Sequence, residues 1–251
     1  LSNCVACVYF FVLLRVRRKT TFVCINPEKF SLQKYIVLGV CAVGIPAAIQ
    51  NLLNVTGMTI LNNFTSSYGA QAVAAMGITQ KINMVPLQVA MGFSQGIMPL
   101  ISYNYASGNH RRMKETIFFT IKTLLPFLVV VSLGYFAGAG LLTRAFMDNE
   151  AIVAYGTRFL RGFCLGLPFL CMDFLAVGVF QAVGMGKAAL SFAILRKIVL
   201  EIPALYLLNL LFPLYGLSYA QLVAELVLSI ASVIMLARIF RRMQREDGAS
   251  S

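Results

Sequence analysis

The chain has 251 residues, of which 59% are hydrophobic and 12% are charged, and its formal net charge is +12. A soluble domain cannot bury that much apolar surface, whereas a protein with several membrane spans leaves it in contact with lipid. The basic excess first suggests nucleic acid, but DNA binding needs a solvated basic face with base-reading side chains, and the charge pattern offers none. We therefore expect a membrane protein with no nucleic-acid partner.

Most Lys and Arg residues gather in four short segments, which alternate with segments nearly free of them. A basic excess in every second loop is typical of loops on the cytoplasmic side of a membrane. The basic segments are Arg15–Lys34, Arg111–Lys122, Lys187–Lys197 and Arg238–Arg245, and the segments between them are Thr65–Val73, Gly138–Ile152 and Phe212–Leu217. This pattern predicts a multi-pass protein whose C-terminus is cytoplasmic.

Apolar stretches predict, in chain order, the end of a truncated helix and then six crossings. Leu1–Leu14 is too short to span a bilayer and carries no charged region in front, so we expect a helix whose beginning is missing. Residues 15–34 form a basic cytoplasmic loop, residues 35–237 an all-α bundle of six transmembrane helices, and residues 238–251 a basic cytoplasmic tail. The predicted crossings are Tyr35–Phe64, Ala74–Tyr103, Thr116–Phe136, Val153–Val183, Ala188–Leu211 and Leu217–Leu236.

Motifs for catalysis or metal binding are missing from the sequence. It contains no HExxH, no nucleophile elbow and no phosphate-binding loop, and His110 is its single histidine. Five of the six cysteines lie within apolar stretches, where they act as small packing residues rather than metal ligands. We therefore expect neither an enzyme nor a cofactor.

Polar and flexible side chains recur at helical spacing along the first, second and fourth crossings. Amides and hydroxyls are poorly suited to lipid, so these faces should turn inward, either to line a cavity or to make ordinary hydrogen bonds between helices. Met and Phe between them can repack around apolar ligands of different shape. The candidate cavity residues are Gln50, Asn51, Asn54, Met58 and Asn62, then Lys81, Met84, Gln88, Met91 and Gln95, and finally Phe180.

Three carboxylates lie inside the predicted crossings. An acid near the middle of a membrane helix costs roughly 2.5–3.5 kcal/mol to insert, and it usually binds a cation or a proton. Asp173 and Glu225 have no basic neighbour within one helical turn, so we predict that they couple transport to an ion or proton. Glu201 lies four residues after Lys197, which predicts a local pair near the cytoplasmic edge. Lys81 could pair with an acid or reach the interface.

Several stretches resemble one transporter family, the MATE-type multidrug exporters. The pattern PLxxYNYxxGN, at Pro99–Asn109, followed by the basic turn Arg112–Lys114, is the most specific of them. The other similar stretches are Gly44–Asn51, Asn62–Ala75, Met76–Ile82, Gly92–Met98, Leu195–Pro203 and Ala224–Glu225. The resemblance covers nearly the whole chain and implies the second six-helix half of a twelve-helix protein, whose N-terminal half is a missing partner.

The resemblance implies an inner (plasma) membrane antiporter that exports organic cations and drugs in exchange for Na⁺ or H⁺. Some branches of the family place a cation-site Glu in helix seven and an Asp in helix ten, which Asp173 matches. Helix seven of this chain carries Gln50, Asn51 and Asn54 instead, and so departs from a sodium site of that design. Two alternatives stay open: a flippase for lipid-linked saccharides from the same superfamily, and a membrane scaffold or receptor that transports nothing.

Overall fold

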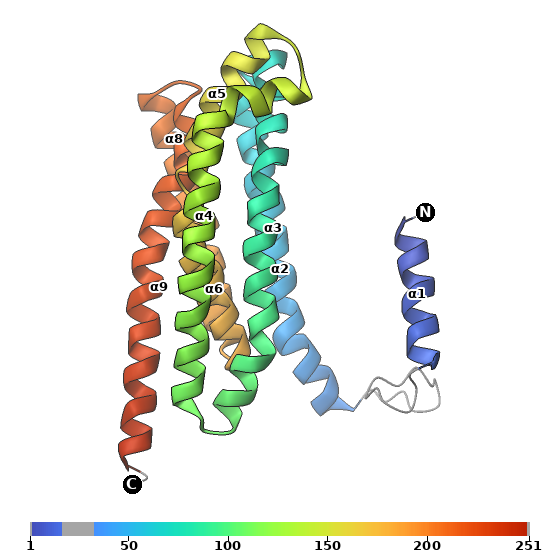
Figure 1. The fold of residues 1–251 in the computed structure, drawn as a ribbon, viewed down its shortest axis with the longest axis vertical. Helices are drawn as coiled ribbons and strands as arrows, with labels where there is room; N and C mark the ends of the chain where they lie inside the picture. The colour runs from blue at the N-terminus through green and yellow to red at the C-terminus, as the bar shows by residue number, and fades with distance from the viewer. Residues whose placement is uncertain (1, 17–32, 250–251) are drawn as a thin grey trace. The chain divides into compact units, whose positions relative to one another are not determined.

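The computed structural model describes residues 2–16, which form one helix, and residues 33–249, in which helices are joined by short turns (Figure 1). The chain divides into two compact units, Leu1–Ala42 and Val43–Ser251. The first contains α1, Ser2–Val16, and the beginning of α2, Lys34–Ser66. Most of the predicted basic loop, residues 17–32, lies outside the described residues.

The second unit continues α2 and contains the rest of the predicted bundle. Its helices are α3 (Ala70–Ala106), α4 (His110–Phe146), α5 (Glu150–Cys164), α6 (Leu167–Ala182), α7 (Gly186–Ile194), the π-helical segment η2 (Leu195–Glu201), α8 (Ile202–Leu211) and α9 (Gly216–Ala249). The long helices α3, α4 and α9 run along one another (Figure 1). Helix α9 extends through residues that the sequence assigns to the tail.

The helices account for all six predicted crossings, and the chain is an all-α polytopic membrane protein. By length and apolar composition, α2, α3, α4 and α9 could each cross a membrane, and α5 with α6 would make a fifth span if the pair counts as one. The remaining crossing is present as α7, η2 and α8, which follow one another without a break. Large apolar side chains such as Val130, Leu133 and Ile230 are exposed on the outer faces, as contact with lipid requires.

The predicted crossing Val153–Val183 is broken rather than continuous. Helices α5 and α6 meet at an angle of 48°. Pro168 lies in the first turn of α6, where a missing N–H does no harm, but it cannot donate back to the end of α5. Gly166, just before it, packs against the α9 backbone at Leu222. The break reorients α6, which carries Asp173, relative to α5.

The next crossing contains a π-helical turn at η2. The N–H of Ile202 donates to the carbonyl of Lys197, five residues earlier, instead of to the fourth residue as in an α-helix. Pro203 follows in the first turn of α8. A proline ring collides with the carbonyl four residues before it in a regular helix, and the wider π turn relieves that collision. Single π turns inside helices are often found at functional sites.

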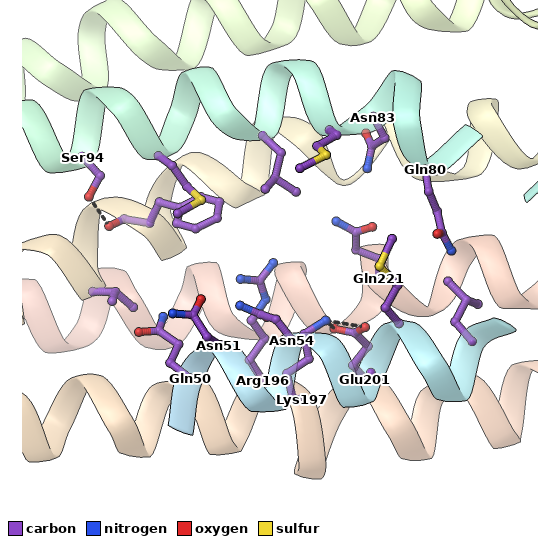
Figure 2. A pocket seen from close by; sticks show the side chains of 18 of the residues that line it. Gln50, Asn51, Asn54, Gln80, Asn83, Ser94, Arg196, Lys197, Glu201 and Gln221 are labelled. Carbon is purple, nitrogen blue, oxygen red and sulfur yellow. Dashed lines mark hydrogen bonds and ion pairs between the residues drawn. The ribbon is translucent and has the colours of Figure 1, made fainter. Parts of the chain in front are cut away.

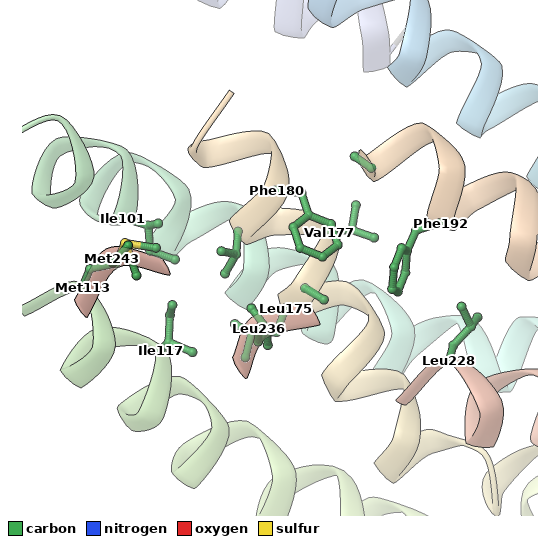
Figure 3. Packing of buried hydrophobic residues seen from close by; sticks show 13 residues of the cluster. Ile101, Met113, Ile117, Leu175, Val177, Phe180, Phe192, Leu228, Leu236 and Met243 are labelled. Atoms are coloured by element: carbon green, nitrogen blue, oxygen red, sulfur yellow. The ribbon is translucent and has the colours of Figure 1, made fainter. Parts of the chain in front are cut away.

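Buried apolar side chains hold the bundle together. One cluster joins α3, α4, α6, α7 and α9, and in it Phe180 packs edge-on against Phe192 at 5.2 Å between ring centroids (Figure 3). Small residues allow other helices to approach closely. A Cβ at Gly162 would overlap the side chain of Ser218, and one at Gly178 would overlap Ser94. These contacts place α6 against α3 and α5 against α9, around the site described next.

Candidate functional site

A cavity of about 460 Å³ lies between α2, α3, α6, η2 and α9, within the second unit (Figure 2). Its size is within the range of pockets that hold drug-sized ligands. The wall is mostly apolar, with Met58, Met84, Met91 and Met98 among its residues. The polar lining residues are Gln50, Asn51, Asn54, Gln80, Asn83, Ser94, Gln95, Gln181, Arg196, Lys197, Glu201 and Gln221.

The structure places seven of the candidate cavity residues in this wall and four outside it. Those in the wall are Gln50, Asn51, Asn54, Met58, Met84, Met91 and Gln95. Lys81 and Gln88 are exposed on α3 and do not line the cavity, and Asn62 is exposed while accepting a hydrogen bond from Gln80 at 3.3 Å. Phe180 is fully buried in the apolar cluster, so its assignment to the cavity is wrong.

Asp173 and Glu225 lie behind the cavity wall and share one partner, Arg196 of η2. One guanidinium nitrogen of Arg196 is 3.0 Å from Asp173 Oδ2, and another forms a short hydrogen-bonded ion pair with Glu225 Oε1. The side chains of Asp173 and Glu225 are 3% and 0% exposed, and that of Arg196 is 12% exposed. The sequence groups Arg196 with a basic segment and gives neither acid a basic neighbour within one helical turn, whereas the structure pairs both acids with Arg196.

The pairing leaves hydrogen-bonding capacity unused. Asp173 Oδ1, Glu225 Oε2 and Arg196 Nε are buried and have no hydrogen-bond partner. The guanidinium also lies 5.5 Å from the centre of the Phe174 ring, a cation–π distance. An unsatisfied buried polar atom is costly, and the two free carboxylate oxygens could accept a proton, a cation or a water, whereas the Nε–H of Arg196 needs an acceptor such as a water oxygen.

Lys197 and Glu201 form a second ion pair, with 2.7 Å between Nζ and a carboxylate oxygen. The spacing of four residues predicts this pair, and the structure shows that both of its residues line the cavity (Figure 2). Gly57 of α2 faces it, because a Cβ there would come within 3.1 Å of Lys197 Cδ. Because Gly57 has no side chain, α2 leaves space for the ion pair of Lys197 and Glu201.

Arg196 is the residue that sequence reasoning missed. The signal for it was present, since Leu195 and Ile198–Leu200 flank Arg196 and Lys197 with apolar residues inside a predicted crossing. Helical spacing compares residues on one helix only, whereas the carboxylates that pair with Arg196 come from α6 and α9. The π turn also changes the register that a regular helix would predict.

The charges of this region suit cations. Three carboxylates face two basic side chains across the two ion-pair groups, so one negative charge is in excess when all five are ionised. Within residues 2–16 and 33–249, no three or more His, Cys, Asp or Glu residues are grouped to hold a metal ion. The site can therefore bind a proton or a single cation by charge, beside a flexible apolar cavity.

Known proteins are similar to this chain in sequence and in fold. The family model MatE matches residues 46–207. Multidrug export protein MepA from Staphylococcus saprophyticus is 32% identical over 94% of the chain and 51% of its own length, and MepA from Staphylococcus haemolyticus is 30% identical over 97% and 53%. The chain thus spans about half the length of the curated relatives it matches.

Solved transporters agree in fold at lower identity. An outward-facing multidrug resistance MATE family transporter of the MOP superfamily superposes with a TM-score of 0.86 at 18% identity, covering 96% of this chain and 55% of that one. The bent form of the Vibrio cholerae MATE transporter VcmN gives 0.83 at 17% identity, covering 94% and 54%. Together with the family match, this shows that the chain belongs to the MATE family of membrane transporters, and not to an enzyme family.

Proposed function

We propose that the protein exports organic cations and drugs across the inner (plasma) membrane, in exchange for Na⁺ or H⁺, by alternating access. The observation that carries the proposal is the juxtaposition of a Met- and amide-lined cavity with two buried carboxylates. The cavity would hold the substrate, and Asp173 and Glu225 would take the coupling ion or proton. The C-terminus would be cytoplasmic.

The cavity wall fits substrates of varied shape. Four methionines can change rotamer to follow a ligand, because the side chain is unbranched and polarisable. Neutral amides of Gln50, Asn51 and Asn54 offer both donors and acceptors without selecting one geometry. Such a wall suits the promiscuous binding that multidrug export needs, and the MepA relatives carry that activity in their names.

The cavity needs a second wall. This chain covers about half of each relative, and transporters built from two bundles place the substrate between them, near the middle of the membrane. We therefore propose that an N-terminal six-helix half of the same polypeptide closes the cavity. Alternating access would then be a rocking of the two halves around the site.

A flippase for lipid-linked saccharides is less well supported. Such a cavity needs basic side chains free to bind phosphates. Lys81 does not line the cavity, and both basic residues that do, Arg196 and Lys197, already hold carboxylates. A cation is the better match for the excess negative charge.

Dye efflux tests the proposal. The full-length protein, reconstituted in proteoliposomes, should move a fluorescent organic cation such as ethidium against its gradient when a Na⁺ or a pH gradient is imposed, and the gradient that drives it names the coupling ion. Asp173→Asn and Glu225→Gln should each reduce this uphill transport at least tenfold, because a neutral side chain cannot exchange a charge.

Surface carboxylates provide matched controls. Asp148→Asn and Glu115→Gln remove the same groups from pairs whose acids are 88% and 62% exposed, so transport should stay within twofold of the unmodified protein. If Asp173→Asn and Glu225→Gln proteins still extrude the dye at full rate, the acids do not couple transport. If neither gradient drives export, the antiport proposal is wrong, and a scaffold or receptor fits better.

A further inference from the structure

Arg196 occupies an unusual position for a basic side chain in a transporter of cations. Its guanidinium contacts both carboxylates, while the residue also lines the cavity (Figure 2). The site that should receive a coupling cation is thus already filled by a cation that belongs to the protein. Any incoming cation must either share the carboxylates with Arg196 or displace it.

We propose that Arg196 is a tethered counter-cation that makes occupation of Asp173 and Glu225 by the coupling ion or proton incompatible with occupation of the cavity by a cationic substrate. The proposal rests on the proposed function, because it describes how exchange at that site is enforced. Arg196 is here a positioning residue: it acts by moving its charge between the carboxylates and the cavity.

The charges require such an exchange. When an ion or a proton binds the carboxylates, they hold Arg196 less strongly, and its guanidinium turns toward the cavity that it already lines. A positive charge in that apolar space repels a cationic substrate. Conversely, a substrate in the cavity pushes Arg196 back onto the acids, which releases the coupling ion. Linkage makes the two effects equal in size.

The unused polar atoms supply the second observation. Arg196 has five N–H donors in a planar fork, and its Nε has no partner, while one oxygen of each acid also lacks one. The pairing is therefore incomplete, as expected of an interaction that must break and re-form in each cycle. A fully satisfied buried network would be more rigid.

The backbone around Arg196 is suited to a change of position. Arg196 lies in η2, whose hydrogen bonds follow π geometry and whose end is set by Pro203. Segments of this kind can rearrange between π and α geometry, and such a rearrangement shifts the register of the side chains they carry. The other charged groups near the guanidinium are Lys197 and Glu201 on η2 itself, and they neutralise each other as a pair.

Equilibrium binding of ethidium to the purified full-length protein tests the proposal. The dissociation constant is measured with and without Na⁺, and at two pH values, in the unmodified protein and in Arg196→Gln, Arg196→Lys and Arg111→Gln. In the unmodified protein the coupling cation should raise the dissociation constant for ethidium at least fivefold, a typical size for coupling between two sites. We call the dissociation constant with the coupling cation divided by that without it the ratio. In Arg196→Gln this ratio should fall to within twofold of one.

The remaining variants separate charge, geometry and surface effects. Arg196→Lys keeps a positive charge without the planar fork and should retain part of the ratio. Arg111→Gln is the matched control, because Arg111 is 91% exposed in a surface pair with Glu115, and it should keep the full ratio. If Arg196→Gln keeps the full ratio, ion and substrate compete directly for the acids and the proposal is overturned.

A folding failure of Arg196→Gln would not end the test. Removing Arg196 leaves two buried carboxylates unpaired, whereas Arg196→Gln with Glu225→Gln keeps the formal charge of the triad unchanged. This double variant is compared with Glu225→Gln alone: a ratio above one that is lost only in the double variant supports the role of Arg196, and a ratio above one that is equal in both variants overturns it. If the unmodified protein exports ethidium and Arg196→Gln keeps the full ratio of dissociation constants, only the inference about Arg196 is refuted. Absence of any ratio in the unmodified protein refutes the proposed antiport as well.

Discussion

At the scale of single residues, the cavity wall carries charge that is balanced locally. Lys197 and Glu201 are each less than 15% exposed at the side chain and contact each other at 2.7 Å. A charge in such a place is tolerated only when it is paired, because desolvation of a lone ion is costly. The pair keeps Lys197 from presenting a bare positive charge to a cationic substrate.

Glu201→Gln should therefore weaken binding of cationic dyes. The change leaves Lys197 unpaired in the wall, and two like charges about 10 Å apart at an effective dielectric constant near 20 repel by about 1.7 kcal/mol. Since about 1.4 kcal/mol is a tenfold change in affinity, the dissociation constant for ethidium should rise at least tenfold in fluorescence titrations. Glu115→Gln, in an exposed pair, is the control, and an unchanged constant in Glu201→Gln would show that Lys197 is already screened.

Residue identity alone predicted much of this site but not its pairing. Asp173 and Glu225 stood out because acids inside apolar stretches are costly, and half of the amides that line the cavity followed from helical spacing. Arg196 did not stand out, because its partners lie on two other helices, and Phe180 was misplaced because spacing cannot separate a cavity face from an apolar packing face. Both errors concern contacts between helices, which are tertiary information.

At the scale of elements, the breaks in two helices decide where the ionisable groups lie. The sequence predicted each crossing, yet not which proline would interrupt one. Pro46, Pro86, Pro99 and Pro126 lie inside unbroken helices, whereas Pro168 follows a bend and Pro203 follows a π turn. Neighbouring helices can satisfy the carbonyls that a proline frees, so its effect depends on packing that the sequence does not state.

Packing of α5 on α9 depends on Gly162. A Cβ at this position would overlap the Ser218 side chain and would approach the Ser218 backbone carbon at 3.3 Å, so Gly162→Ala must push the two helices apart. Overpacking of this kind costs about 1–3 kcal/mol. The unfolding temperature of the purified protein in detergent should fall by several degrees.

Gly134→Ala is the matched control for that change. Gly134 also lies inside a helix, α4, but a Cβ there would meet nothing within 4 Å. Alanine is the better helix former, so this variant should be as stable as the unmodified protein or slightly more so. Equal unfolding temperatures for the Gly162 and Gly134 variants would show that α5 and α9 adjust without cost.

At the scale of the whole molecule, the direction of each helix through the membrane remains a prediction from charge. The turn between α3 and α4 is followed by Arg111, Arg112 and Lys114, whereas the turn between α2 and α3, Ser67–Gly69, has no basic residue. Basic residues favour the cytoplasmic side, so the turn between α3 and α4 should face the cytoplasm and the turn between α2 and α3 should face the outside. The cavity would then have its Gln50 end toward the cytoplasm and its Gln80 end toward the outside (Figure 2).

Two serines in equivalent turns test this orientation. Ser67 and Ser107 both follow the end of a long helix, both are exposed, and each donates to the carbonyl three residues earlier. In a full-length protein whose native cysteines are replaced, Ser67→Cys should react with a membrane-impermeant maleimide on intact cells, because its turn faces outward. Ser107→Cys should react only after the membrane is permeabilised. The opposite labelling would invert the topology and place the basic turn, with the C-terminus, outside the cell.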